Sequence, residues 1–336
     1  MNVPKNNKNL SKNLALAMCI GALASIPYTA AAATVTSPID IQVRDDFYNG
    51  ETITDDVTID TSGTSDIAVS VKSIERTPAG NIASLKLDLK GDVRIKSGTN
   101  YALYTSTTTF LNMAQININT FGEDKLVQIE GNIKAEYLRA APWEPPMNSQ
   151  VNLSLTNAES YFSGDMEAAK TINDPNDGIF YGAATIKLDL SNGATWYPAS
   201  TNSYTLGFYD DVSNPGMQQW DDGIFIRSDG GIIDIYHSLP GQARTGADNA
   251  NRVFKLDNIS DYNSGYNGSG NSNIVFRIGT DVANGKADRI ELSGSATGTM
   301  PNGTHEIQVV ADPSFTTDSD VKIDASGKNI IVAKVD

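Results

Sequence analysis

Few residues of this sequence have types and spacings suited to catalysis. Its only histidines are His237 and His305, and they are too far apart to form a paired zinc site on one strand or helix. The single cysteine, Cys19, lies in an amino-terminal segment that we expect to be removed, which excludes thiol catalysis. No phosphate-binding loop and no Gly-x-Ser-x-Gly strand-to-helix elbow is present.

Carboxylates are abundant, and paired acids could cleave a glycosidic bond by hydrolysis or elimination. The adjacent pairs Asp210-Asp211 and Asp221-Asp222 are the candidates. Neighbours on an extended chain point in opposite directions, however, so we interpret these pairs as solvated turn residues. A calcium site at Asp174–Gly178, or around Asp221 and Asp222, is the alternative, because calcium prefers clustered oxygen ligands. We therefore assign no catalytic residue, cofactor ligand or metal ligand, and we expect the protein not to be an enzyme.

The amino-terminal segment has the pattern of a secretory signal peptide. Lys5, Lys8 and Lys12 precede an apolar run over Leu14–Ile26, and Ala30–Ala33 supply the small residues at which signal peptidase cuts. The apolar run of about 13 residues is too short for a membrane span. We predict a signal peptide over residues 1–33, with cleavage after Ala32 or Ala33.

The portion after the signal peptide is strongly acidic. Removing three lysines leaves 22 basic against 40 acidic side chains, a net charge of about −18. This charge disfavours nucleic acid and anionic membrane surfaces as partners. Because this portion has no cysteine, apolar burial alone must stabilise its fold, and some 300 residues suffice for that.

The elements that would position any site are short strands with alternating aliphatic residues. One motif, in which alternating aliphatics end in a polar, Gly or Asn turn, occurs four times, in Leu85–Asp92, Val127–Asn132, Val151–Ala158 and Ile186–Ala194. The first residues of these copies are 42, 24 and 35 positions apart. Spacings of this kind predict a solenoid with coils of about 20 to 25 residues plus insertions.

This pattern predicts an all-β fold, specifically a right-handed parallel β-helix. Alternate aliphatic side chains would point into one continuous core, and Asn and Gly would form the tight corners. A β-sandwich is the alternative, although it would require more two-residue hairpin turns. Two interruptions, Ala140–Met147 and Tyr161–Gly178, are expected to be loops outside the coils.

Three segments resemble the passenger domains of pertactin-like autotransporters. They are Leu188–Trp196, with the pattern L-x-N-G-A-x-W, then Gly230–Ile235, with G-G-x-[IV]-D, and Ala287–His305, which resembles the autochaperone-like end of such a passenger. The resemblance implies irregular β-helix coils over residues 34–184 and a pertactin-like carboxy-terminal β-helix over 185–312. Residues 313–336 would then be terminal strands.

The resemblance also implies a function and an export route. The chain would be a non-enzymatic passenger at the surface of a Gram-negative bacterium or released from it, mediating adhesion to an unidentified host or cell-surface ligand. An outer-membrane β-barrel translocator is expected in a full-length protein but not in this sequence. A secreted carbohydrate-active lyase or hydrolase and a structural cell-surface component are the alternatives. Structural or autochaperone-like roles are implied for Trp196, Gly230, Gly231, Asp288, Ile290, Leu292, Gly294, Gly298 and His305.

Overall fold

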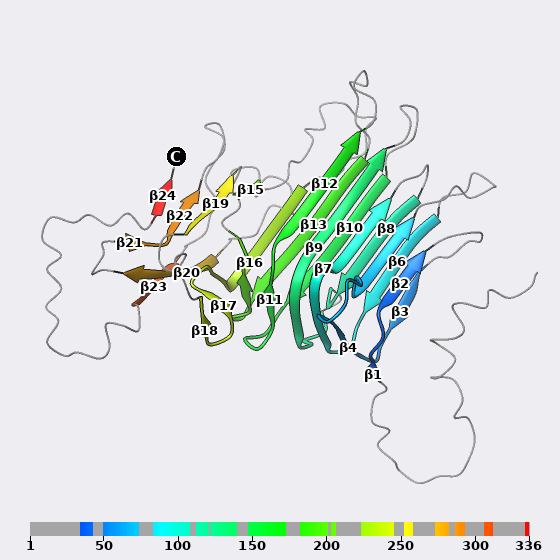
Figure 1. Cartoon of the computed structure of the whole chain (residues 1–336), viewed down its shortest axis with the longest axis horizontal. Coiled ribbons are helices and arrows are strands. Elements are labelled where there is room, and N and C mark those ends of the chain that lie inside the picture. Colours follow the sequence, from blue (N-terminus) through cyan, green and yellow to red (C-terminus); the bar gives the residue numbers. More distant parts are fainter. Residues whose placement is uncertain are drawn as a thin grey trace, which may run out of the picture.

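The computed structural model describes residues 34–42, 50–73, 83–107, 112–120, 122–139, 147–172, 182–200, 203–205, 223–244, 252–257, 273–281, 286–292, 306–311 and 333–335. These residues form strands and turns and contain no helix (Figure 1). A membrane-crossing helix is accordingly not found among them. The prediction of an all-β fold is confirmed.

Most strands belong to three parallel stacks that run side by side along the molecule (Figure 1). The first stack contains β1 (Thr34–Val35), β4 (Asp56–Thr61), the beginnings of β7 (Val93–Thr107) and β9 (Val127–Arg139), β11 (Tyr161–Ser163) and β14 (Thr195–Tyr197). The second contains β2 (Ile39–Gln42), β5 (Val69–Ser73), the ends of β7 and β9, and β12 (Met166–Ile172). The third contains β3 (Glu51–Ile53), β6 (Ala83–Leu89), β8 (Asn112–Ile118), β10 (Met147–Leu155), β13 (Gly182–Ser191) and the beginning of β16 (Gly223–Asp234).

Among the described strands, five successive coils each add one strand, or half of a long strand, to every stack, which makes the fold a β-helix. In the first stack Val57 pairs with Val93, 36 residues later, and Val93 pairs with Val127, 34 residues later. The expected length of 20 to 25 residues plus insertions matches the first coil, where Val35 pairs with Val57, 22 residues later. The next coils are longer by more than ten residues.

The irregular spacing of the repeated motif has a simple cause. The copies that begin at Leu85, Val151 and Ile186 all lie in the third stack, where Val151 and Ile186 are register partners 35 residues apart. The copy that begins at Val127 lies in the first stack instead. The motif therefore marks two different sides of the coil, and its spacing cannot equal the coil length.

The carboxy-terminal part changes this arrangement. The end of β16 joins the first stack, followed by β20 (Asn273–Asp281) and β23 (Glu306–Ala311). A separate parallel stack contains β15 (Ser203–Thr205), β19 (Val253–Asp257), β22 (Arg289–Leu292) and β24 (Ala333–Val335). Short antiparallel pairs are made by β17 (His237–Leu239) with β18 (Gln242–Ala243) and by β21 (Lys286–Ala287) with β20. The other pairs among the described strands are parallel, which overturns the β-sandwich alternative because a sandwich is built from antiparallel sheets.

The core is a set of apolar ladders in which each side chain packs on its register partner in the next coil. One ladder crosses seven strands of the first stack through buried residues: Ile59, Ile95, Ile129, Phe162, Trp196, Ile233 and Phe276. Burying each such side chain contributes on the order of 1.5–3 kcal/mol. The alternation seen in the sequence thus becomes one continuous interior.

Asparagine forms corners of the coil, as predicted. Asn119 and Asn192 have positive φ values of 54° and 53°, a left-handed conformation that asparagine tolerates better than most residues. The side-chain amide of Asn192 donates to the carbonyl of Thr156 at 2.9 Å, and that of Asn119 donates to the carbonyl of Ser154 at 3.1 Å. Each corner is therefore tied to an adjacent coil.

Two sequence-based expectations require correction. The expected loop over Tyr161–Gly178 contains β11 and β12, because Phe162 and Met166 are buried and hold this segment in the stacks. On β23, the alternation of Ile307 and Val309 is typical of a strand with these side chains turned to the core, but they are 38% and 55% exposed. Among the described strands β23 pairs in parallel only with β20, so no further described coil covers its inward face.

Candidate binding groove

Trp196 is an interior residue. It is fully buried on β14, its ring stacks on Phe162 at a centroid distance of 6.2 Å, and it meets Phe254 edge-on at 5.5 Å. Its indole Nε1 donates to the carbonyl of Gly164 at 2.9 Å. The residue therefore joins two consecutive coils and the separate stack that contains β19.

The two predicted glycines in β16 have different local requirements. Gly230 has a φ of 73°, a left-handed conformation that favours glycine. Gly231 has no room for a side chain, because a Cβ there would lie 2.9 Å from the backbone carbonyl carbon of Leu190. Both lie where β16 passes from the third stack to the first.

Asp288 is a fully buried carboxylate that joins three segments. Its Oδ1 accepts a hydrogen bond from the backbone N–H of Arg252 at 2.8 Å, and its Oδ2 accepts one from the N–H of Gly279 at 2.9 Å. Burial raises the pKa of Asp288, and the two backbone hydrogen bonds oppose that rise. Arg252 is also buried, and its guanidinium donates to the carbonyl of Ile235 at 2.7 Å. This cluster holds strands together and offers no opening to a ligand.

The remaining predicted residues do not form a site with these. Ile290 is buried on β22, and Leu292 follows on the same strand in register with Leu256. Other candidates lie outside the described residues: Gly294, Gly298, His305, Asp174–Gly178, Asp210, Asp211, Asp221 and Asp222. In the part of the chain that the structure describes, no group of three metal-binding side chains occurs.

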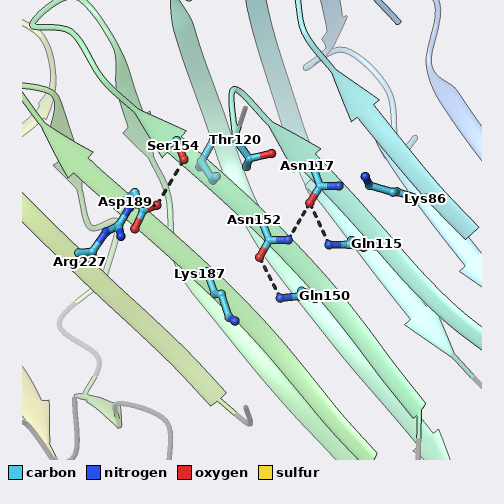
Figure 2. A pocket seen from close by; sticks show the side chains of 11 residues that line it. Lys86, Gln115, Asn117, Thr120, Gln150, Asn152, Ser154, Lys187, Asp189 and Arg227 are labelled. Carbon is cyan, nitrogen blue, oxygen red and sulfur yellow. Dashed lines mark hydrogen bonds and ion pairs between the residues drawn. The ribbon is translucent and has the colours of Figure 1, made fainter. Parts of the chain in front are cut away.

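An open groove of about 450 Å³ lies on the outer face of the third stack (Figure 2). It crosses β6, β8, β10, β13 and β16, because the polar residues of the alternating pattern point outward from each strand while the aliphatic residues point inward. The lining residues are Lys86, Gln115, Asn117, Thr120, Gln150, Asn152, Leu153, Ser154, Lys187, Asp189 and Arg227.

The floor of the groove is a connected row of side-chain amides (Figure 2). Asn117 Oδ1 accepts hydrogen bonds from Gln115 at 3.0 Å and from Asn152 at 2.7 Å. Asn152 in turn accepts one from Gln150 at 2.9 Å. Asn117 also donates to the carboxylate of Asp88 at 2.6 Å. These bonds fix the amide orientations, so the floor presents its polar atoms in a preorganised array.

Charged side chains flank this floor at both ends. Lys86 Nζ lies 3.1 Å from Asp88 Oδ2 at one end, and Arg227 lies 3.0 Å from Asp189 Oδ2 at the other. Burial raises the pKa of the Asp189 carboxyl, and the positive charge of Arg227 opposes this shift. Lys187 adds a third positive charge beside the floor (Figure 2).

The spacing of the two carboxylates does not suit glycosidic cleavage by paired acids. Asp88 lies on β6 and Asp189 on β13, which are three strand positions apart, and neighbouring strands are about 4.8 Å apart, giving a separation of roughly 14 Å. Glycosidases place their two carboxyl groups roughly 5 to 9.5 Å apart. The arrangement is better suited to holding a polar ligand than to breaking it.

Sequence reasoning missed this groove although its signal was present. The repeated motif contains Lys86, Asn152, Lys187 and Asp189 between its aliphatic residues. Taken one strand at a time, these positions are only the outward side of an alternating strand. Recognising the groove requires the register that places Asn117 beside Asn152 and Ser154 beside Asp189, 35 residues apart.

Comparisons of the chain with protein-family models, with curated proteins and with solved structures give no match. The structure by itself therefore defines the class of the protein, an all-β parallel β-helix with a polar groove on one face.

Proposed function

We propose that the chain is an exported, pertactin-like passenger that is displayed at or released from the surface of a Gram-negative bacterium, where it binds a surface ligand without chemical conversion. The parallel β-helix carries this proposal, because it is the architecture that the resemblance of Leu188–Trp196 and Gly230–Ile235 implies. The signal-peptide pattern over residues 1–33 and the absence of cysteine after Cys19 are consistent with export.

The export step is tested by producing the full chain in a Gram-negative host and determining the amino terminus of the product by mass spectrometry. The expected product begins at Ala33 or Thr34. A variant with Leu16→Arg, which places a charge in the apolar run, should accumulate uncleaved inside the cell. An uncleaved wild-type chain that stays in the cytoplasm would refute the export proposal.

The binding step is tested separately with the folded, purified protein. Adhesion of protein-coated particles to host cells and to bacterial surfaces should exceed that of particles coated with an unrelated acidic protein. Equal adhesion of both particles would favour the alternative of a structural surface component with no specific ligand.

A carbohydrate-active enzyme is a second candidate, because the groove combines Asp189 with Arg227 and Lys187. The wide separation of Asp88 and Asp189 weighs against paired-acid hydrolysis. Release of reducing ends or a fall in viscosity of a polysaccharide solution would support this candidate. This cleavage activity should be absent from an Asp189→Asn variant.

A further inference from the structure

We infer that the groove on the third stack binds an acidic polysaccharide whose chain lies along the solenoid axis. This inference deepens the proposed function and rests on it for the biological setting. It concerns the chemistry of the ligand, which the proposed function leaves open.

The first argument is the shape of the groove. It extends from Lys86 on β6 to Arg227 on β16, which is four strand positions, or roughly 19 Å at about 4.8 Å per strand. The groove is open and not an enclosed cavity. A linear polymer can occupy it and continue beyond both ends, whereas a small molecule would contact only part of it.

The second argument is the chemistry of the floor. Neighbouring strands present the same residue types, Gln115 beside Gln150 and Asn117 beside Asn152. A side-chain amide both donates and accepts hydrogen bonds, as sugar hydroxyls do, and Thr120 adds a hydroxyl. Like groups that recur at one strand spacing suit a ligand that also repeats along its length.

The third argument is charge. Three basic residues, Lys86, Lys187 and Arg227, line the groove, while two acids face it, Asp88 beside Lys86 and Asp189 beside Arg227. Basic residues therefore outnumber acids here, whereas the whole chain has 25 basic and 40 acidic residues. None of the described residues that line it is aromatic, so these residues offer hydrogen bonds and charge but no surface for sugar stacking. Charge-assisted hydrogen bonds to ligand anions then become the main attraction. At physiological salt the screening length is about 8 Å, so the distant acidic surface contributes little to the field at the groove.

Calorimetric titration of the purified full chain with defined polymers tests this inference. Polygalacturonate supplies carboxylates, dextran sulfate supplies sulfates, and fully methyl-esterified polygalacturonate supplies an uncharged chain with the same sugar. We expect saturable binding of at least one polyanion that weakens with added salt, and no binding of the ester. The stronger of the two polyanions identifies the anion that the groove recognises.

Variants then locate the bound polymer. Lys187→Gln and Arg227→Gln should each weaken binding roughly tenfold, since each removes a charge-assisted hydrogen bond. Gln150→Ala should weaken it without any change of charge. Lys96→Gln is the matched control, because Lys96 lies on β7 in the first stack with its side chain 53% exposed, and it should bind like wild type. Thermal unfolding confirms that each variant is folded.

Three results would overturn the inference: no binding of either polyanion, equal binding of the methyl ester, or equal weakening by Lys96→Gln and Lys187→Gln. Each of these would leave cleavage and export of the chain intact. Conversely, a chain that binds the polyanion but is not exported would contradict the proposed function and not this inference.

Discussion

The indole Nε1 of Trp196 donates a hydrogen bond to the carbonyl of Gly164 in the preceding coil, at 2.9 Å. The same ring is fully buried against Phe162 and Phe254. Trp196→Ala should therefore lower the free energy of unfolding by about 3–5 kcal/mol, measured by urea denaturation. Trp196→Phe keeps most of the apolar contact and loses the hydrogen bond, so its effect should be smaller. Equal losses for the two variants would contradict this account of the core.

Gly230 and Gly231 allow a comparison of two backbone effects at adjacent positions. Gly231→Ala should prevent the close approach of β16 to Leu190, since the added carbon would lie 2.9 Å from a backbone atom. A Cβ at position 230 would meet no other atom within 4 Å. Gly230→Ala should therefore lower the free energy of unfolding by only about 1–2 kcal/mol, the cost of its left-handed backbone conformation. Thermal unfolding should therefore show a much lower midpoint for Gly231→Ala. A larger loss for Gly230→Ala would contradict the observed close approach.

Ile290 tests the autochaperone-like role that the resemblance implies, in which the carboxy-terminal strands fold first and the other coils add onto them. Ile290→Asp places a charge at a buried position on β22 and should cost several kcal/mol. If these strands fold first, refolding from urea should fail along the whole chain, and protease should digest the amino-terminal coils as well. Leu292→Asp on the same strand is expected to act in the same way.

Val309→Asp is the control for the folding test, because Val309 is 55% exposed on β23 and a charge there remains hydrated. It should refold like wild type. Protease resistance of β4 to β13 in the Ile290→Asp variant would show that the first coils fold without the template.

The pH dependence of stability should depend on Asp189. Burial raises its pKa above the ordinary value of 3.8. Between pH 3.8 and this raised pKa, the folded chain binds a proton more readily than the unfolded chain. The free energy of unfolding of wild type, minus that of Asp189→Asn, should therefore fall as pH rises through that window. Urea denaturation at a series of pH values measures this difference.

Asp60 provides a control of opposite sign. A hydrogen bond from the Ser62 side chain lowers its pKa, so the contribution of Asp60 to stability is present above 3.8 and is lost as pH falls through the lowered value. The free energy of unfolding of wild type, minus that of Asp60→Asn, should therefore rise with pH. The same slope for both variants would mean that a general charge effect, and not the local surroundings, sets the pH profile.

The fold class could be predicted from the sequence because the alternation in Leu85–Leu89 and Ile186–Leu190 is a local property of each strand. The coil length could not, because a pattern of period two does not state which side of the coil a strand occupies. Val127 shows this, since its motif matches that of Leu85 while the two residues lie in different stacks.

The groove was less predictable than the core. Its floor depends on Asn117 and Asn152 lying side by side, and only the register between β8 and β10 establishes that relation. Trp196 shows the contrast, because the size of an apolar indole ring by itself favours a core or coil-end position. Its partners Phe162 and Phe254 likewise depend on register and packing that the linear sequence does not contain.

The coils of 33 to 36 residues between Val57 and Thr195 in the first stack also limit how this molecule can change its length in evolution. Each coil in the first stack pairs only with the coils before and after it, so duplication or deletion of one complete coil preserves all other pairings. A gain or loss of one residue inside a strand would instead turn the inward side chains outward. Natural homologues of different size should therefore differ by whole coils, each adding about 4.8 Å to the axis.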